Sequence, residues 1–230
     1  MVLEEYRQRL HPYIARLARP LLGWPPAAIS AVALVAAIAA GGLAAGTRWL
    51  GPVGFLPVAL LVLLSGVFDV LDGEVARATG RASRRGDFVD HVFDRYADLA
   101  ILLGIAASGF VNPLLALVAL VSLLLTGYMG TQAEAVGQGR LYSGLLTRAD
   151  RLVVLAAATF LEFDWTLPWP WAPNEPWSQF AVYGVRFTVL DVAMLYFVIA
   201  GQWTAIARAI RVYRALPSSG SGPPPPPAGP

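Results

Sequence analysis

The sequence predicts an all-α membrane protein in which six transmembrane helices follow an interfacial amphipathic helix. Of the 230 residues, 57% are hydrophobic and only 14% are charged, more apolar surface than a soluble domain of this size needs to bury. The apolar residues gather in stretches that suit bilayer crossings by their length and low internal charge. These stretches are residues 27–46, 54–78, 87–109, 113–136, 149–163 and 180–212.

The chain divides into three parts by composition. In residues 1–20, apolar side chains recur at spacings of three and four from Leu3 to Leu17, so they share one helix face. Arginines on the other face would meet anionic lipid, which predicts a helix lying in the headgroup region. Residues 21–214 hold the six spans. Residues 215–230 are rich in proline, glycine and serine, and we expect a disordered tail.

Arginine distribution predicts the orientation in the membrane. Four arginine-rich segments fall on one side: the N-terminal helix, residues 78–86, residues 137–151 and the end of the last span. The positive-inside rule places this side, and with it both termini, in the cytoplasm. The net charge of +2 is too small to indicate a nucleic-acid partner.

Two residue types are missing from the sequence, and each absence excludes a class of chemistry. No cysteine is present, which excludes disulfides, thiolate zinc sites and thiol nucleophiles. No lysine is present either, which excludes Schiff-base catalysis and leaves arginine for phosphate contacts.

Four aspartates occur at helical spacing in or beside two of the apolar spans. Asp69 and Asp72 are three residues apart, and Asp90 and Asp94 are four apart, so each pair shares a helix face. The segment between the pairs is short, so we expect two antiparallel helices whose carboxylates converge at the cytoplasmic end. A carboxylate within a membrane costs about 3 kcal/mol unless something pairs with it. Oxygen ligands of this kind suit Mg²⁺ or Mn²⁺, and four of them suit two ions.

Small residues and an arginine accompany the aspartates. Gly73, Ala76 and Gly86 would let a bulky ligand approach the helix backbones, and Arg77 would bind a phosphate group through two hydrogen bonds. Two alternatives remain open at this point. The aspartates could pair with arginines and hold helices together, or they could form the cation or proton pathway of a transporter. Transporters usually place such sites near the midplane on broken helices, whereas these acids lie toward one face.

The pattern D-x-x-D-G-x-x-A-R, then G-x-x-x-D-x-x-x-D, resembles the signature of the CDP-alcohol phosphotransferases, integral membrane enzymes of phospholipid synthesis. The plan of an interfacial helix and six spans is also similar to that family's, so the resemblance covers residues 3–214. Every fixed position of the signature is filled: Asp69, Asp72, Gly73, Ala76, Arg77, Gly86, Asp90 and Asp94.

The resemblance implies a catalytic transmembrane domain at residues 21–214 that uses a CDP-linked lipid, either CDP-diacylglycerol or CDP-archaeol. A small alcohol would displace CMP, with two Mg²⁺ or Mn²⁺ ions per site and no covalent enzyme intermediate. Asp69, Asp72 and Asp90 would bind the metals, and Asp94 would bind the second metal and accept the proton of the alcohol. The family's habit also implies a homodimer.

The resemblance further implies which residues contact the CDP-lipid. They are Gly73, Ala76, Arg77, Ser83 and Gly86, together with Ala27 and Ser30. The last two come from Pro26-Ala-Ala-Ile-Ser30, which stands where the family often has Pro-Asn-x-x-Thr, so alanine replaces the asparagine.

Two arginines three residues apart, Arg148 and Arg151, suggest an acceptor that itself carries a phosphate. They could instead anchor the helix among lipid headgroups. The stretch from Tyr128 to Arg151 is similar to the branch of the family that uses inositol phosphate, with Gln132 standing where arginine is usual. We therefore expect Arg148, Arg151 and Gln132 to bind the acceptor phosphate, with inositol 1-phosphate as the acceptor and glycerol 3-phosphate as the alternative.

Four further polar residues receive secondary roles. We expect His91 to point away from the ligand face, and Asp98 to act in helix packing or behind the metal ligands. Asp191 is expected to bond a neighbouring helix, and Glu74 to face solvent or the loop arginines.

Overall fold

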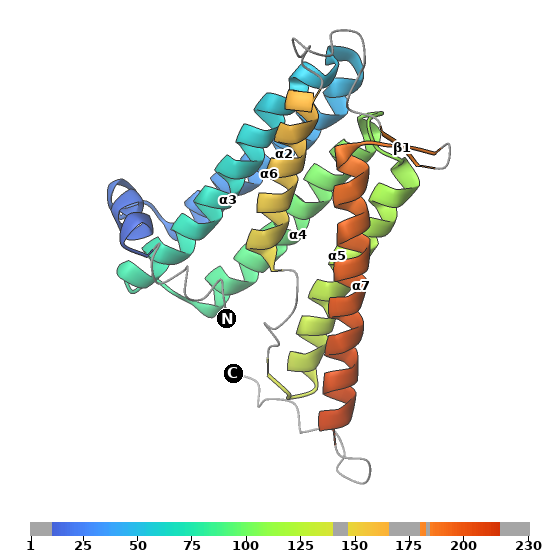
Figure 1. Cartoon of the computed structure of the whole chain (residues 1–230). Helices are drawn as coiled ribbons and strands as arrows, with labels where there is room; N and C mark the ends of the chain where they lie inside the picture. The colour runs from blue at the N-terminus through green and yellow to red at the C-terminus, as the bar shows by residue number, and fades with distance from the viewer. Residues whose placement is uncertain (1–10, 140–146, 166–179, 183–184, 217–230) are drawn as a thin grey trace.

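The computed structural model describes residues 11–139, 147–165, 180–182 and 185–216. In these residues, helices dominate and pack side by side (Figure 1). Residues 11–18 are helical, and the placement of this helix at the membrane surface stays a prediction. Four further segments lie outside the described residues: residues 1–10, the 140–146 segment, the tryptophan-rich segment 166–179 and the tail 217–230. The elements are η1 (Arg19–Leu21), α2 (Pro26–Leu50), η2 (Pro52–Gly54), α3 (Phe55–Ala78), α4 (Arg84–Ala107), α5 (Pro113–Ala135), α6 (Arg148–Trp165), β1 (Phe180–Val182), β2 (Val185–Phe187) and α7 (Val189–Ala215).

Four segments in the described part of the chain are long and apolar enough to cross a membrane: Pro26–Leu50, Pro52–Ala78, Pro113–Ala135 and Val189–Ala215. They correspond to α2, η2 with α3, α5 and α7. The other two long helices, α4 and α6, carry the charged residues of the candidate site, which lowers their hydropathy. The prediction of a helical membrane protein is confirmed, whereas a count of six spans stays a prediction.

Helix starts follow local capping chemistry. The Ser83 hydroxyl accepts a hydrogen bond from the Gly86 amide and begins α4, and the Asn112 side chain caps α5 in the same way. At α7, Thr188 and Asp191 form a reciprocal capping box. Asp191 also accepts a hydrogen bond from the Asn112 amide at 2.8 Å, which confirms that it bonds a neighbouring helix.

The predicted start of the last span at residue 180 is wrong. Phe180 to Phe187 instead contains two short antiparallel strands, β1 and β2, in which Phe180 pairs with Phe187. The helix begins only at Val189, after the Thr188 cap. The apolar composition of this segment misled the prediction, because apolar character alone does not distinguish a strand from a helix.

Small residues set the closest helix contacts. The backbone of α2 at Gly41 meets α4 so closely that a Cβ atom on Gly41 would lie 2.1 Å from the Ala100 carbonyl oxygen. On the other side of the bundle, α5 and α7 pack together, and the Thr126 hydroxyl of α5 donates to the Gly201 carbonyl of α7 at 3.0 Å. The most extensive helix contacts join α2 with α3 and α4, and α5 with α7, while α6 packs against both α3 and α7 and α4 packs against α5.

Candidate functional site

A tight turn after α3 brings the two aspartate pairs together. Gly80 has a positive φ of 66°, which lets the helix end in a Schellman motif. In this motif the Arg81 amide donates to the Ala76 carbonyl at 3.0 Å, and the Gly80 amide donates to the Arg77 carbonyl at 3.3 Å. The chain then reverses and α4 begins at Arg84, so the carboxyl-terminal end of α3 and the amino-terminal end of α4 lie at the same end of the bundle, and both helices pack against α2.

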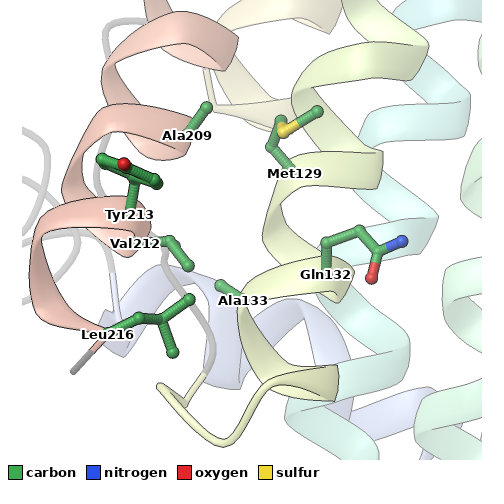
Figure 2. Close-up of a pocket in the computed structure, with 7 residues that line it drawn as sticks. All are labelled: Met129, Gln132, Ala133, Ala209, Val212, Tyr213 and Leu216. Carbon is green, nitrogen blue, oxygen red and sulfur yellow. The ribbon is translucent and has the colours of Figure 1, made fainter. Parts of the chain in front are cut away.

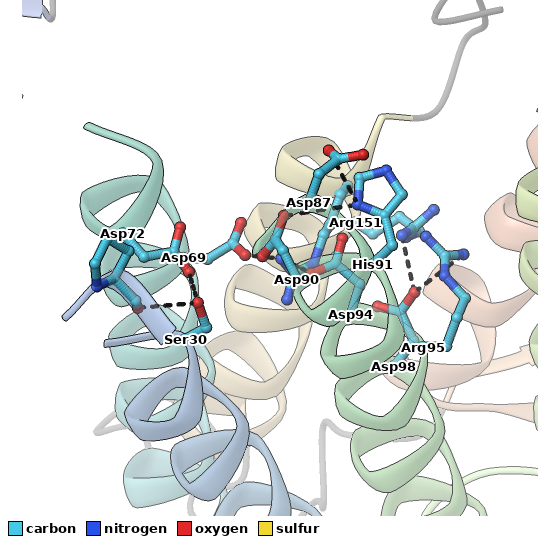
Figure 3. Close-up of polar contacts among 12 residues, drawn as sticks. Ser30, Asp69, Asp72, Asp87, Asp90, His91, Asp94, Arg95, Asp98 and Arg151 are labelled. Carbon is cyan, nitrogen blue, oxygen red and sulfur yellow. Dashed lines mark hydrogen bonds and ion pairs between the residues drawn. The ribbon is translucent and has the colours of Figure 1, made fainter. Parts of the chain in front are cut away.

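The four predicted carboxylates converge as expected. Oxygen atoms of Asp69, Asp72 and Asp90 lie within 4.8 Å of one another, and Asp90 also belongs to a second group with His91 and Asp94. Figure 3 shows these side chains directed into a common space, with Asp69 and Asp72 coming from α3 and Asp90 and Asp94 from α4. Asp72 and Asp94 are buried, with 5% and 8% of their surface exposed. The site thus has the high density of negative charge that a multivalent cation requires.

Arg148, at the first turn of α6, completes the wall of this space. Its guanidinium contacts both Asp69 and Asp94, one carboxylate from each of the two helices. A single cationic group can therefore reach acids from α3 and α4 at once, so the two pairs are close enough to share a ligand. The predicted acceptor residue Arg148 lies directly beside the predicted metal ligands.

The carboxylates suit a hard divalent cation. Their donors are carboxylate oxygens without a thiolate, and Asp90 is common to both groups, as a ligand that bridges two ions would be. The two groups and the buried positions of Asp72 and Asp94 fit Mg²⁺ or Mn²⁺.

His91 is nearer to the acids than we expected. Its Nδ1 atom lies 3.8 Å from carboxylate oxygens of Asp87 and of Asp90. The prediction that it points away from the ligand face is wrong, because an imidazole nitrogen lies within 4.8 Å of carboxylate oxygens of Asp90 and Asp94.

Ser30 is buried and contacts one of the four carboxylates. The buried Ser30 hydroxyl lies 2.5 Å from Asp72 Oδ2 and 3.2 Å from the Pro26 carbonyl oxygen, and each of these oxygens can accept its hydrogen bond. The hydrogen bond fixes the orientation of one carboxylate across the α2–α3 contact. Ala27, the other residue predicted from this segment, is exposed on the first turn of α2.

The two predicted acceptor arginines have different surroundings. Arg151 is 3% exposed, and its Nη2 donates to Asp98 Oδ2 at 2.8 Å. Asp98 is also buried and lies 3.8 Å from Arg95 Nη1. The expectation that Asp98 stands behind the ligands agrees with these contacts, and Arg151 is held in place by that acid.

Sequence reasoning missed two arginines that surround the same space. The Arg95 guanidinium lies against the bare backbone of α5, where a Cβ atom on Gly127 would be 2.6 Å from Arg95 Nη1. Arg208 of α7 donates to the Thr126 carbonyl at 2.7 Å and has Arg95 and Arg151 as charged neighbours. Arg95 lies one residue after Asp94, but nothing in the sequence shows that α7 brings Arg208 to α4 and α6.

The remaining predicted contacts of the CDP-lipid lie along the ends of α3 and α4. Gly73 and Ala76 are half-buried, and Gly86 is exposed beside the capping hydroxyl of Ser83. The Arg77 side chain lies over Gly73, and its guanidinium is paired with the Glu74 carboxylate.

Glu74 is buried, unlike the expectation for this residue. The prediction that it faces solvent or the loop arginines is wrong, because the residue is 7% exposed and covered by the N-terminal helix. The spacing of Glu74 in the sequence places it off the ligand face of α3, but spacing does not show which helix packs over that position.

Gln132 does not join the arginines in the described residues. It lies on the last turns of α5 beside an apolar groove against α7, and its amide contacts the Tyr128 hydroxyl. Figure 2 shows the amide directed away from the apolar side chains of α7. The groove is lined by Met129, Gln132, Ala133, Ala209, Val212, Tyr213 and Leu216.

Comparison with known proteins identifies the family of this chain. The family model described as CDP-alcohol phosphatidyltransferase matches residues 25–190. Archaetidylinositol phosphate synthase from Methanothermobacter thermautotrophicus is 33% identical over 183 residues, covering 80% of each protein. Phosphatidylinositol phosphate synthase from Cutibacterium acnes is 32% identical over 189 residues, covering 74% of this chain and 85% of the relative.

A solved structure has the same arrangement of helices. The phosphatidylinositol phosphate synthase from Mycobacterium tuberculosis with CDP-DAG bound superposes with a TM-score of 0.65 at 25% identity. The match covers 87% of this chain and 93% of that protein. Since the family model spans well over half of the sequence and includes the whole aspartate pattern, the chain belongs to the CDP-alcohol phosphatidyltransferase family.

Proposed function

We propose that this membrane transferase uses a CDP-linked lipid as donor and inositol 1-phosphate as acceptor, and releases CMP. The observation that carries the proposal is the contact of Arg148 with both Asp69 and Asp94. It puts a phosphate-binding side chain directly beside the carboxylates that would hold the donor's metals. The names of the relatives, archaetidylinositol phosphate synthase and phosphatidylinositol phosphate synthase, support the same acceptor.

The donor is CDP-diacylglycerol or CDP-archaeol. The solved relative with CDP-DAG bound supports a CDP-lipid for this chain. We place its nucleotide and pyrophosphate along Gly73, Ala76, Arg77, Ser83 and Gly86, because these residues expose helix backbone and a guanidinium next to the acids. Ala27 lies at the edge of this surface, and Ser30 supports it through Asp72.

Asp69, Asp72, Asp90 and Asp94 would hold two ions. Mg²⁺ or Mn²⁺ bound there supplies positive charge that neutralises the pyrophosphate and the departing CMP. The acceptor hydroxyl oxygen bonds to the phosphorus that carries the lipid, and the bond from that phosphorus to the CMP oxygen breaks. Asp94 accepts the hydroxyl proton, because its carboxylate lies in the same space as the Arg148 guanidinium that would orient the acceptor.

Arginines from three helices would recognise the acceptor phosphate. Arg148 and Arg151 come from α6, and we add Arg95 from α4 and Arg208 from α7 because they are charged neighbours around the same space. Asp98 accepts a hydrogen bond from Arg151 and lies 3.8 Å from Arg95, so it holds two of these guanidinium groups beside the acidic site. Guanidinium groups gathered in this way favour an alcohol that carries a phosphate over a neutral alcohol. We no longer assign Gln132 to this contact.

The membrane arrangement is part of the proposal. α4 and α6 would complete six spans, with the charged ends of both helices at the cytoplasmic face and residues 1–20 on the membrane surface. The arginine distribution supports this orientation. A homodimer is proposed from the family resemblance alone.

An acceptor panel tests the function. Purified protein in detergent with Mg²⁺ and CDP-diacylglycerol or CDP-archaeol should release CMP when inositol 1-phosphate is added, and much less with inositol or serine. Glycerol 3-phosphate as the best substrate would replace the acceptor assignment. Absence of metal-dependent CMP release with every acceptor would overturn the proposed function.

The substitution Arg148→Ala should raise the KM for the acceptor by about tenfold or more and leave the KM for the donor nearly unchanged. The expectation follows from the loss of a charge-assisted contact to the acceptor phosphate. Steady-state CMP release with each substrate varied in turn provides the measurement. Equal increases of both KM values would remove Arg148 from the acceptor pocket.

The substitution Ser30→Ala should raise the Mg²⁺ concentration for half-maximal activity by about tenfold, because the hydroxyl no longer orients Asp72. A metal titration of CMP release measures this value. The control is Ser108→Ala, which removes another buried hydroxyl at the opposite end of α4 and should leave the metal dependence unchanged. Identical metal dependence in Ser30→Ala and wild type would contradict the proposed support of Asp72.

A further inference from the structure

Glu74 is a buried acid between the guanidinium of Arg77 and the imidazole of His11. Its Oε2 accepts a hydrogen bond from Arg77 Nη2 at 3.0 Å, and its Oε1 lies 3.4 Å from His11 Nε2. Only 9% of the glutamate side chain is exposed. A carboxylate removed from water needs such partners, because an unpaired buried charge is strongly destabilising. The two contacts therefore fix the carboxylate in one position on α3.

The fixed carboxylate determines where Arg77 lies. A Cβ atom on Gly73 would be 3.4 Å from Arg77 Nη1 and 3.9 Å from its Cζ, so the guanidinium rests over the bare backbone of Gly73. The Arg77 side chain is nevertheless 56% exposed, which leaves donor groups free to meet a ligand. An arginine side chain loses rotamer entropy when it is immobilised. A partner that already restrains it reduces the entropy lost on binding.

The N-terminal helix packs over Glu74. His11 meets Glu74 near the start of the described part of that helix. Ala18, near its end, is buried in a small apolar cluster with Ile29, Leu71 and Val75. The helix is thus attached to α3 at two points, and Glu74 lies beneath it rather than in solvent.

We propose that Glu74 is a positioning residue, which holds the Arg77 guanidinium over Gly73 in the orientation that binds the phosphates of the CDP-linked donor. The inference rests on the proposed function, because it takes the surface around Gly73 as the donor site. The competing explanation is a purely structural ion pair. A purely structural pair would contribute to the stability of the protein and would not change substrate binding.

A double-mutant cycle separates the two explanations. The full-length variants Glu74→Gln, Arg77→Gln and the double variant are purified in detergent, and the Kd for CDP-diacylglycerol is measured together with both KM values. Glu74→Gln should raise the donor Kd and donor KM by about fivefold and leave the acceptor KM unchanged. In the Arg77→Gln background the same change should have no further effect, because Glu74 acts through Arg77.

Two controls define the outcome. Glu162→Gln removes another buried carboxylate, at the opposite end of the bundle in α6, and Arg48→Gln removes an exposed arginine near the end of α2. Neither should change the donor Kd. Equal effects of Glu74→Gln on donor and acceptor, additive effects in the double variant, or an unchanged donor Kd would each overturn the positioning role. Failure of the proposed function would instead appear as missing CMP release by the wild-type protein, while the donor Kd still tests the role of Glu74.

Discussion

Asp94→Asn should abolish turnover and leave the fold and donor binding intact. The amide has nearly the same shape as the carboxylate, but it cannot accept the acceptor's proton and it removes one negative charge from the metal site. A general base contributes roughly 10²–10⁴-fold to a rate, so we expect kcat for CMP release to fall at least about 100-fold. Thermal unfolding in detergent and the Kd for CDP-diacylglycerol should remain near the wild-type values.

The same helix provides a matched control. Asp87→Asn makes an identical chemical change about two turns earlier in α4, at a side chain that is 66% exposed. It should retain turnover, because Asp87 is outside the group formed by Asp69, Asp72 and Asp90. Near-normal kcat in Asp94→Asn would show that another group accepts the proton.

Gly41→Ala should prevent α2 and α4 from packing correctly. The added Cβ atom would lie 2.1 Å from the carbonyl oxygen and 2.6 Å from the carbonyl carbon of Ala100, both in the backbone of the facing helix. Backbone atoms cannot rotate away, so the helices must separate. Overpacking of this kind costs about 1–3 kcal/mol and occasionally more. Because α4 carries Asp90 and Asp94, activity should fall together with the unfolding temperature.

The neighbouring glycine shows whether the effect comes from this contact. A Cβ atom on Gly42 would meet nothing within 4 Å, so Gly42→Ala should be neutral or slightly stabilising, as alanine is the better helix former. The measurements are the thermal unfolding temperature and the yield of monodisperse protein for both variants. Similar results for Gly41→Ala and Gly42→Ala would contradict the proposed close approach of α2 and α4.

Local sequence signals predicted much of the fold and the acidic centre. The predicted span 54–78 corresponds to α3, which runs from Phe55 to Ala78. This span could be predicted because length and low internal charge are properties of the segment itself. The convergence of Asp69, Asp72 and Asp90 followed from their spacing and from the short turn between the helices. The start of α7 was also encoded locally, since Thr188 and Asp191 are separated by two residues as a capping box requires.

Residues brought together by distant parts of the chain could not be predicted in the same way. The burial of Glu74 depends on His11 in the N-terminal helix, and the position of Arg208 depends on how α7 packs against α5. Helical periodicity reports which face a residue occupies, but it does not report which helix covers that face. The role of Ser30 as a CDP-lipid contact came from the family resemblance, which did not show that its hydroxyl donates to Asp72 across the α2–α3 contact.

The separate packing of α5 with α7 has a consequence for how headgroup preference can evolve. Thr126 and Gly201 join these helices through contacts that do not involve α2 or α3, which hold Ser30, Asp69 and Asp72. Substitutions on α7 can therefore reshape the space around Arg208 without touching the helices that hold Ser30, Asp69 and Asp72. An ancestral enzyme could come to accept a new polar alcohol by changes confined to this helix, while the chemistry common to all its descendants stayed constant.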